Sequence, residues 1–562
     1  MAFQYFVSKL LFSDHSAVDL IEGDITLVIG PNNCGKSEAL RNIWERISIP
    51  DGEQRPTKVV KDVKVVVSVG PEAVHEIVAT LEENPSNPGQ VGRMGMHVGR
   101  ADLLQLNANA DWLRRTLHQL LVRLLGAGER LNITSPPQSI DLTTQIKSHP
   151  IHYLYADEDL EKSFSTDFRK AFGTDLTVNH FAGQIVPLHI GDRPGVPPGG
   201  DRLSQGYRTA ISKLPLLHQQ GDGMRSFVGT LLWARVSDYR VLLVDEPEAF
   251  LHPPQARLLA RVLAKTKKST SQIIAATHSG DFLRGVLDSN VSKLRVVRLT
   301  RKDEINPTTV LSPEQLKELW SDPLIRQSNV LDALFHEQCV VCESEGDSQF
   351  YAGVLNALSD LKPDQVVPDT MFVSVGGKDR VPKATAALSR LNVRVKVILD
   401  FDVLRSEQPL RAIFESLRGT WGNIQTHWKV VNQAVSGKKA QLDVKDVTKR
   451  ISSVLGDIKT DYVSDATLED IRDITRKASA WSEAKTIGDQ FIPAGQATQE
   501  YQILSQKLQT QGVFIVQVGE LEGFDKTIPG HGPAWVGGVM QKNLGTDPAL
   551  EKARQFVNLV VK

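Results

Sequence analysis

Cysteines and long hydrophobic runs are scarce in this sequence. Only three cysteines occur among 562 residues, which excludes a disulfide framework and predicts a reducing, cytoplasmic location. Cys339 and Cys342 form a C-x-x-C pair in a segment that we interpret as a strand, and no matching second pair completes a zinc site. No apolar run approaches the roughly 18 residues that a membrane-spanning helix needs, so no membrane association is expected.

The sequence also lacks a large net charge of either sign. The chain has 65 basic and 66 acidic side chains and a formal charge of −1, so bulk charge neither favours nor excludes nucleic acid. Basic stretches at 257–268 and 293–302 are interpreted as solvated faces, with a phosphate track as the alternative. The length exceeds what one hydrophobic core supports and predicts about two to four domains.

The first half contains a phosphate-binding loop. Residues 24–47, "DITLVIGPNNCGKSEALRNIWERI", predict a strand, a loop and a helix. The loop follows the pattern G-x-x-x-x-G-K-S, in which the glycines let backbone N–H groups surround phosphates. Lys36 is expected to reach the β- and γ-phosphates, and the hydroxyl of Ser37 to ligate Mg²⁺. ATP is therefore the predicted cofactor, held by Gly30, Asn33, Gly35, Lys36 and Ser37.

Two further strands of this half end in polar residues. In "YRVLLVDEPEAFLHPPQARLL", residues 239–259, an apolar strand ends in Asp245 and Glu246. Asp245 is the expected Mg²⁺ ligand, and Glu246 is the expected base that orients the attacking water. Another strand, in "SQIIAATHSGDF", ends in Thr277 and His278.

The order of these motifs resembles that of ABC-type ATPases of the SMC and recombination-protein-F kind. The resemblance implies that His278 senses the γ-phosphate. It also implies that ATP binds between two head domains, one giving the phosphate loop and the other a glycine-rich signature, so a homodimer or higher homo-oligomer is expected. The ATPase domain is predicted to span residues 1–335. A helical insertion at roughly 75–180 is a candidate dimerisation element.

Two stretches compete for the glycine-rich signature. The letters of "DRLSQGYR" (201–208) match the signature better, but Ser204 lies 41 residues before Asp245, whereas Gly221 lies 24 before it. In the family, the signature opens the helix that leads directly into the Asp-Glu strand. The spacing therefore favours Gly221 and Gly223, at a helix N-terminus where free N–H groups attract phosphate.

Acidic residues also end predicted strands in the second half. Strands and helices alternate from residue 339 to 404, which predicts a parallel sheet with its site at the strand carboxyl ends. Glu343 ends one strand, and Asp400 and Asp402 end another in "VILDFDVL". Converging carboxylates would be costly without a cation, so a Mg²⁺ or Mn²⁺ site is predicted.

This half is similar to the Toprim fold of topoisomerases, bacterial primases and OLD-family nucleases. The family's Glu-Gly-x-x-Asp motif corresponds to Glu343–Asp347, with Ser344 in place of glycine, and Glu345 is a competing choice for the catalytic acid. The resemblance further implies a late acid and a lysine, for which Glu520 and Lys526 are preferred over Glu522 and Lys542. The metal ligands implied are Glu343, Asp347, Asp400, Asp402 and Glu520.

The combined order, an SMC-like ATPase followed by a Toprim domain at 336–562, resembles the OLD family (overcoming lysogenization defect). The predicted fold class is α/β, with a second helical insertion at roughly 405–510. The resemblance implies an ATP-regulated, metal-dependent DNA endonuclease in bacterial anti-phage defence, with DNA and an additional defence protein as partners. The alternatives are a DNA clamp or sensor that recruits another effector without cleaving, and a primase- or topoisomerase-like activity.

Overall fold

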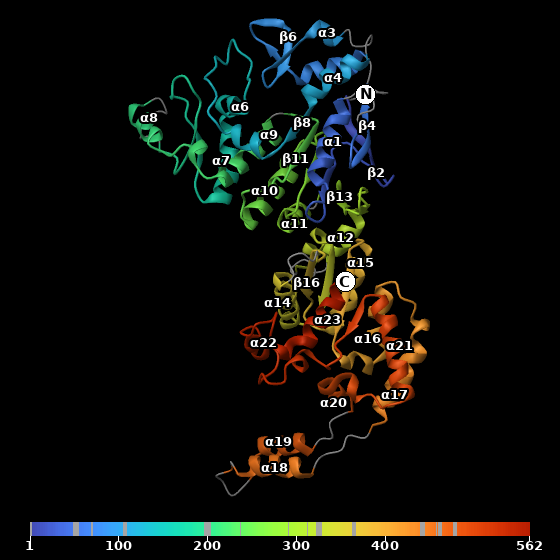
Figure 1. The fold of residues 1–562 in the computed structure, drawn as a ribbon. Coiled ribbons are helices and arrows are strands. Elements are labelled where there is room, and N and C mark those ends of the chain that lie inside the picture. The colour runs from blue at the N-terminus through green and yellow to red at the C-terminus, as the bar shows by residue number, and fades with distance from the viewer. Residues whose placement is uncertain are drawn as a thin grey trace. The chain divides into compact units, whose positions relative to one another are not determined.

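The computed structural model divides the chain into two compact units, Met1–Arg326 and Gln327–Lys562 (Figure 1). The structure describes residues 3–48, 56–68, 71–104, 110–195, 204–236, 238–289, 291–311, 313–321, 329–361, 367–438, 444–456, 458, 463–475 and 480–562. Among these residues, no helix combines the length and the apolar character needed to cross a membrane. Each unit is built around its own parallel sheet and is described separately.

The first unit contains a six-stranded sheet in the order β14-β13-β3-β12-β11-β8. Its strands are β3 (Ile25–Ile29), β8 (Val122–Leu125), β11 (Val241–Asp245), β12 (Gln272–Ala276), β13 (Leu294–Leu299) and β14 (Thr308–Leu311). All neighbours pair in parallel except β13 and β14. Every residue of β3 and β12 is buried, as expected for central strands covered on both faces. Because β3, β12 and β11 are parallel neighbours, their carboxyl ends lie side by side at the same end of the sheet.

Helices and a second sheet complete the core of this unit. The three-stranded sheet β2-β1-β4 consists of β1 (Tyr5–Phe12), β2 (Ala17–Asp19) and β4 (Val60–Val67). Buried side chains of β1, of α1 (Lys36–Ser48) and of the main sheet, such as Leu10, Leu40 and Leu243, form one hydrophobic cluster. Three further helices follow or precede the main strands: α9 (Asp222–Val236), α10 (Pro253–Thr266) and α11 (Gly280–Asp288).

The segment predicted as a helical insertion at 75–180 contains strands as well as helices. It contains a three-stranded antiparallel sheet of β5 (Glu82–Asn84), β6 (Asn87–Arg93) and β7 (Met96–Gly99). It also contains β8, which pairs with β11 in the main sheet, so the prediction of one helical insertion was wrong. The physical reason is that β8 directly follows the amphipathic helix α4 (Ala110–Leu121), and its short apolar run continues the helical pattern. The remaining helices of this segment are α2 (Pro71–Thr80), α3 (Arg100–Leu104), α5 (Ala127–Asn132), α6 (Pro150–Ala156) and α7 (Glu158–Phe172).

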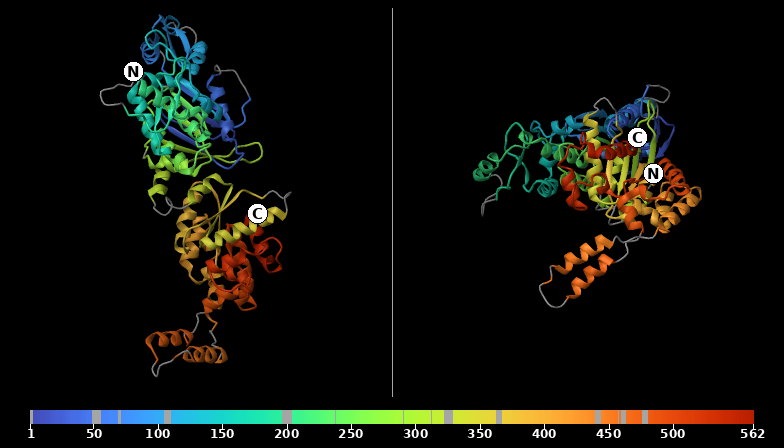
Figure 2. Two further views of the ribbon diagram at one scale, coloured as in Figure 1. Left: turned by 90° about the vertical axis from the view of Figure 1, so that its left-hand side faces the viewer. Right: turned by 60° about the horizontal axis from the view of Figure 1, so that its bottom comes forward.

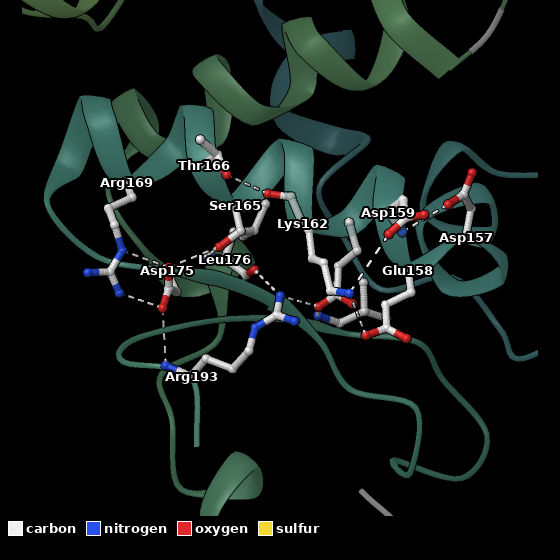
Figure 3. Close-up of polar contacts among 12 residues, drawn as sticks. Asp157, Glu158, Asp159, Lys162, Ser165, Thr166, Arg169, Asp175, Leu176 and Arg193 are labelled. Carbon is white, nitrogen blue, oxygen red and sulfur yellow. Dashed lines mark hydrogen bonds and ion pairs between the residues drawn. The ribbon is translucent and has the colours of Figure 1, made fainter. Parts of the chain in front are cut away.

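Polar contacts hold α7 against the hairpin of β9 (Leu176–Val178) and β10 (Leu188–Ile190) (Figure 3). Asp157 caps α7 by accepting from the backbone N–H groups of residues 159 and 160. Arg169 binds Asp175 with two parallel contacts, Nε to Oδ1 at 2.8 Å and Nη2 to Oδ2 at 2.5 Å. Arg193 donates to Glu161 Oε1 at 2.7 Å. The hydrogen bond from Arg169 lowers the pKa of Asp175 to about 2, although burial acts in the opposite direction.

The second unit contains a four-stranded, all-parallel sheet in the order β16-β15-β17-β18. The strands are β15 (Gln338–Cys342), β16 (Thr370–Ser374), β17 (Arg394–Leu399) and β18 (Val513–Ile515). The chain crosses from β15 to β16 through α14 (Glu345–Leu361) and returns to β17 through α15 (Val381–Arg390). Because the two crossovers run in opposite directions with the same hand, they cover opposite faces. Cys339 and Cys342 are fully buried in β15.

An aromatic core covers one face of this second sheet. Phe350 and Tyr351 on α14 pack against Phe524, Trp535 and Phe556, with ring centroids about 5 to 6 Å apart. Trp535 belongs to α22 (Pro533–Val539) and Phe556 to α23 (Glu551–Val561). This face is therefore closed by elements from the C-terminal end of the chain.

The described residues between 405 and 510 are largely helical, as the sequence indicates. The helices are α16 (Glu407–Ser416), α17 (Gln425–Ser436), α18 (Val444–Gly456), α19 (Asp465–Thr475), α20 (Ala480–Ile487) and α21 (Gln496–Thr510). α18 and α19 lie side by side (Figure 2), and α17 packs on α21. α20 packs on the short helix η5 (Phe401–Arg405), which directly follows β17. The helical segment is thus attached to the end of a central strand.

We expect Asp175→Asn to lower the stability of the first unit by about 1 kcal/mol near pH 7. The pKa of Asp175 falls from 3.8 to about 2 in the folded chain, so its contribution is complete above about pH 4 and is lost as the pH falls towards 2. Calorimetry at about pH 7 and about pH 3 should show the difference in thermal midpoint from the parent shrinking with acid. Asp192→Asn is the control, because Asp192 is 94% exposed and lies 3.7 Å from Arg169. A difference that is equal at both pH values would contradict this assignment.

Candidate functional sites

The predicted phosphate loop joins β3 to α1. Gly30 has a φ of +145°, and a Cβ there would lie 2.0 Å from the carbonyl oxygen of Leu299, so only glycine fits. Gly35 and Asn33 also have positive φ values, +92° and +59°. The Lys36 ammonium donates to the carbonyl oxygens of Gly30 at 2.9 Å and Pro31 at 2.8 Å. The buried ammonium therefore lies within the loop that would surround the phosphates.

Ser37 and Asp245 meet beside this loop. The Ser37 hydroxyl donates to Asp245 Oδ1 at 2.9 Å, joining the start of α1 to the end of β11. Burial raises the pKa of Asp245, and the neighbouring Glu246 adds to this, while the bond from Ser37 opposes it. A hydroxyl and a carboxylate oxygen at this separation are suitable ligands for Mg²⁺.

Glu246 and His278 face each other at the ends of β11 and β12. Glu246 has a φ of +47°, which is uncommon for a residue other than glycine, and its N–H donates to the carbonyl oxygen of Ala276 at 2.8 Å. The Nδ1 atom of His278 lies 3.4 Å from Glu246 Oε1. Both side chains are about half exposed, 47% and 48%, so they remain accessible to water and to a ligand.

Sequence reasoning did not identify Glu248 and Arg130, which support this site. Glu248 is buried and accepts from Thr277 Oγ1 at 2.7 Å and from the N–H of His278 at 3.0 Å. Burial raises its pKa. Arg130 is fully buried and donates to the carbonyl oxygens of Asp245 at 2.5 Å and Glu246 at 2.9 Å. The second acid of "DEPE" was a visible signal for Glu248, but no local pattern marks Arg130.

The two glycine-rich stretches begin different helices. α9 begins at Asp222, which pairs with Arg225 at 2.9 Å, and leads towards β11. A Cβ on Gly223 would lie 2.7 Å from the carbonyl oxygen of Phe250, whereas Gly221 has open space. Ser204 caps the shorter helix α8 (Gln205–Ser212) by accepting from the N–H of residue 207. The structure thus confirms a helix N-terminus at 221–223 and places a second one at Ser204.

A second group of acidic side chains lies at the carboxyl ends of β15 and β17. The N–H of Asp400 donates to Glu343 Oε1 at 3.2 Å, although 57 residues separate them. Burial raises the pKa of Glu343, with contributions from Asp402 and Asp347. Burial, followed by the charge of Glu343, raises the pKa of Asp400 to about 7. The structure therefore brings Glu343 and Asp400 together at the ends of neighbouring strands.

Asp347 and Glu345 have different surroundings on α14. Asp347 Oδ2 accepts from the N–H of Ser344 at 2.9 Å, and burial followed by the charge of Glu522 raises its pKa. Glu345 is exposed and accepts from Gln349 within its own helix at 3.2 Å. Of the two candidate acids, Glu343 therefore lies in the acid group, whereas Glu345 lies on the helix surface.

Glu520 and Glu522 both lie near this group, so both remain candidates for the late acid of the site. Each offers a carboxylate oxygen, and together with His531 their potential ligand atoms lie within 4.8 Å of one another. Burial and the charge of Glu522 raise the pKa of Glu520. Glu522 also accepts from the N–H of Gly532 at 2.7 Å, which fixes part of its position.

The cations beside these acids are not those that the sequence suggested. Lys485 on α20 lies 3.0 Å from Asp400 Oδ2 and 3.8 Å from Glu520 Oε2. Lys378 lies 3.3 Å from Asp402 Oδ2.

The expected lysines point elsewhere. Lys526 is exposed and lines a cavity of about 390 Å³ with Asp489 and Lys552. The alternative, Lys542, pairs with Asp525 at 2.5 Å and with Asp547 at 3.6 Å. The ammonium beside Asp400 thus belongs to Lys485 of α20, whereas Lys526 is exposed next to Asp525, which pairs with Lys542, so the role of Lys526 stays a prediction.

Comparisons with known proteins find one protein-family model and two nucleases that are similar to parts of this chain. A protein-family model described as "AAA domain, putative AbiEii toxin, Type IV TA system" matches residues 201–284. The Old nuclease of Escherichia phage P2 is 22% identical over 172 residues, which cover 29% of this chain and 28% of that protein. The OLD nuclease of Thermus scotoductus is 26% identical over 216 residues, 36% of each chain.

Solved structures resemble the chain weakly. The SMC head bound to the C-winged helix domain of ScpA aligns with a TM-score of 0.30 and 14% identity, covering 55% of this chain and 99% of that one. A score of this size carries no fold assignment, which therefore depends on the strand order and motifs described above. The matched segments span about a third of the length of the two nucleases. On these matches, the chain is distantly similar to OLD nucleases, and its residues 201–284 match an AAA domain.

Proposed function

We propose that the chain is an ATP-regulated, divalent-metal-dependent DNA endonuclease. The observation that carries the proposal is the convergence of Glu343, Asp400 and Glu520 from three neighbouring strand ends, with Lys485 among them. Buried carboxylates of this kind repel one another unless a cation neutralises them. The distant similarity to two OLD nucleases supports a nuclease activity. DNA as the substrate and phage defence as the setting are part of the proposal.

The residues of this second site fit a divalent metal. Glu343, Asp347, Asp400, Asp402 and either Glu520 or Glu522 would hold Mg²⁺ or Mn²⁺ through hard oxygen ligands. Such an ion would polarise the scissile phosphate and lower the pKa of a bound water. The protein's own contribution is to orient the acids. The N–H of Asp400 fixes Glu343 at 3.2 Å, and the N–H of Ser344 fixes Asp347 at 2.9 Å.

The first unit is proposed to bind and hydrolyse ATP. Its loop would surround the phosphates, Ser37 and Asp245 would hold Mg²⁺, and Glu246 would accept a proton from the attacking water. Arg130 positions the Asp245 and Glu246 backbone, and Glu248 orients the backbone at His278. Pairing of two such units across ATP, with Gly221 and Gly223 of one facing the loop of the other, would make a homodimer the hydrolysing form.

Glu343→Gln and Asp400→Asn should each reduce divalent-dependent cleavage of supercoiled plasmid by about 100-fold or more, because each removes a charged ligand or base. Cleavage is measured with Mg²⁺ and with Mn²⁺, in the presence and absence of ATP. Glu345→Gln is the matched control, since this exposed acid lies two residues away and outside the acid group. Cleavage retained by both site variants would place the nuclease site elsewhere, whereas a parent chain that does not cleave DNA at all would favour the non-cleaving clamp.

Glu246→Gln should bind ATP like the parent and hydrolyse it about 100-fold more slowly, because the amide keeps the shape but loses the proton acceptor. Lys36→Ala should weaken ATP binding itself through loss of a charge-assisted phosphate contact. A fluorescent ATP analogue measures binding, and phosphate release measures turnover. Glu304→Gln, at an exposed turn of the same unit, is the control. Hydrolysis at the parental rate in both site variants would place the ATPase site elsewhere.

Gly221→Arg should fold and bind ATP but lose most ATP hydrolysis, because the added side chain would obstruct a partner's γ-phosphate at the α9 N-terminus. Gly221 is the better position for this test, since a Cβ on Gly223 would clash with the carbonyl oxygen of Phe250. Ser204→Arg should have the milder effect on hydrolysis. The reverse ranking, with both variants folded by circular dichroism, would assign the signature to the stretch at Ser204.

A further inference from the structure

A basic turn lies directly beside the acidic site of the second unit. It joins β16 to α15 and contains Gly376, Gly377 and the short helix η4 (Lys378–Arg380). Gly376 and Gly377 have φ values of +71° and +124°, a conformation that strongly favours glycine. Gly377 has open space where a Cβ would be, so backbone shape, rather than close packing, requires a glycine there.

Two contacts attach this turn to the acids. The N–H of Gly377 donates to the carbonyl oxygen of Glu343 at 2.8 Å, and Lys378 Nζ lies 3.3 Å from Asp402 Oδ2. Because β16 is the parallel neighbour of β15, the turn leaves the sheet at the same edge as Glu343. Its position is therefore determined by the strand end that carries a proposed metal ligand.

The charges of the turn face solvent. Lys378, Arg380 and Lys383 are exposed, and Asp379 is an exposed acid between them. Within the part of the chain that the structure describes, Arg380 and Lys383 make no ion pair, although acidic side chains lie nearby. A Cβ on Gly376 would lie 3.0 Å from Arg380 Nη1, so the guanidinium extends over the glycine turn. Cations left without a protein partner beside a strongly acidic site are available to an external anion.

We propose that this turn is a phosphate-binding subsite for the DNA strand, adjacent to the phosphate that is cut. The inference rests on the proposed nuclease function and adds the residues that bind the DNA backbone there. Arg380 contacts a phosphate through its planar guanidinium, and Lys383 contributes a second positive charge. Lys378 remains paired with Asp402 and keeps the turn next to the metal ligands. The subsite offsets the repulsion between the acid group and the polyanion, which acts over roughly 8 Å at physiological salt.

The salt dependence of DNA binding tests this proposal. Binding of the full chain to a short fluorescein-labelled duplex is measured by anisotropy in EDTA, so that no cleavage takes place. Each phosphate contact contributes about 0.9 to the slope of log affinity against log salt concentration. Arg380→Gln and Lys383→Gln should each reduce the slope by about 0.9 and weaken binding about eightfold near 0.1 M salt. Asp379→Asn should strengthen binding.

Lys429→Gln is the matched control, because Lys429 is an exposed lysine on α17, a helix that carries none of the acids. It should leave the slope unchanged. Slopes for the Arg380 and Lys383 variants equal to that of Lys429→Gln would overturn the proposal, as would a parent chain that does not bind DNA. A parent that binds DNA with the expected slopes but never cleaves it would retain the subsite and refute the nuclease function, so the two failures are distinguishable.

Discussion

Carboxylates that converge at the buried end of a parallel sheet repel one another, and the second unit depends on how this repulsion is balanced. Burial, together with the charges of Asp402 and Asp347, raises the pKa of Glu343, and the pKa of Asp400 reaches about 7. Without an ion, Lys485 and Lys378 supply the opposing charge at 3.0 and 3.3 Å. The helical segment is therefore part of the site, because α20 brings Lys485 to the end of β17.

Backbone contacts keep α20 in this position. A Cβ on Gly519 would lie 2.0 Å from the carbonyl oxygen of Lys485, and one on Gly488 would lie 2.0 Å from that of Gln517. The N–H of Phe401 donates to the carbonyl oxygen of Gly519 at 2.8 Å. These close approaches link the end of β17, the loop after β18 and the end of α20, so Lys485 is held beside the strand ends that carry the acids.

In the first unit, acidic side chains also follow a buried strand, and a buried arginine contacts the backbone there. Asp245 and Glu246 follow a buried strand, and the guanidinium of Arg130 binds both of their carbonyl oxygens. The two carboxylates have other neighbours. Asp245 accepts from the Ser37 hydroxyl, and Glu246 faces solvent and His278. Arg130 thus fixes the backbone at the end of β11, and its positive charge also lowers the pKa of Asp245.

The sequence by itself determined the features that depend on short stretches of chain. The loop at Gly30–Ser37, the apolar strands before Asp245 and Asp400, and the helical character of 405–510 follow from local spacing and periodicity, which the folded chain preserves. Only the tertiary structure placed Glu343 beside Asp400, brought Lys485 to the same strand end, revealed Arg130, and showed that β8 belongs to the main sheet. Each of these features depends on which distant segments of the chain are in contact, and local sequence patterns do not predict such contacts.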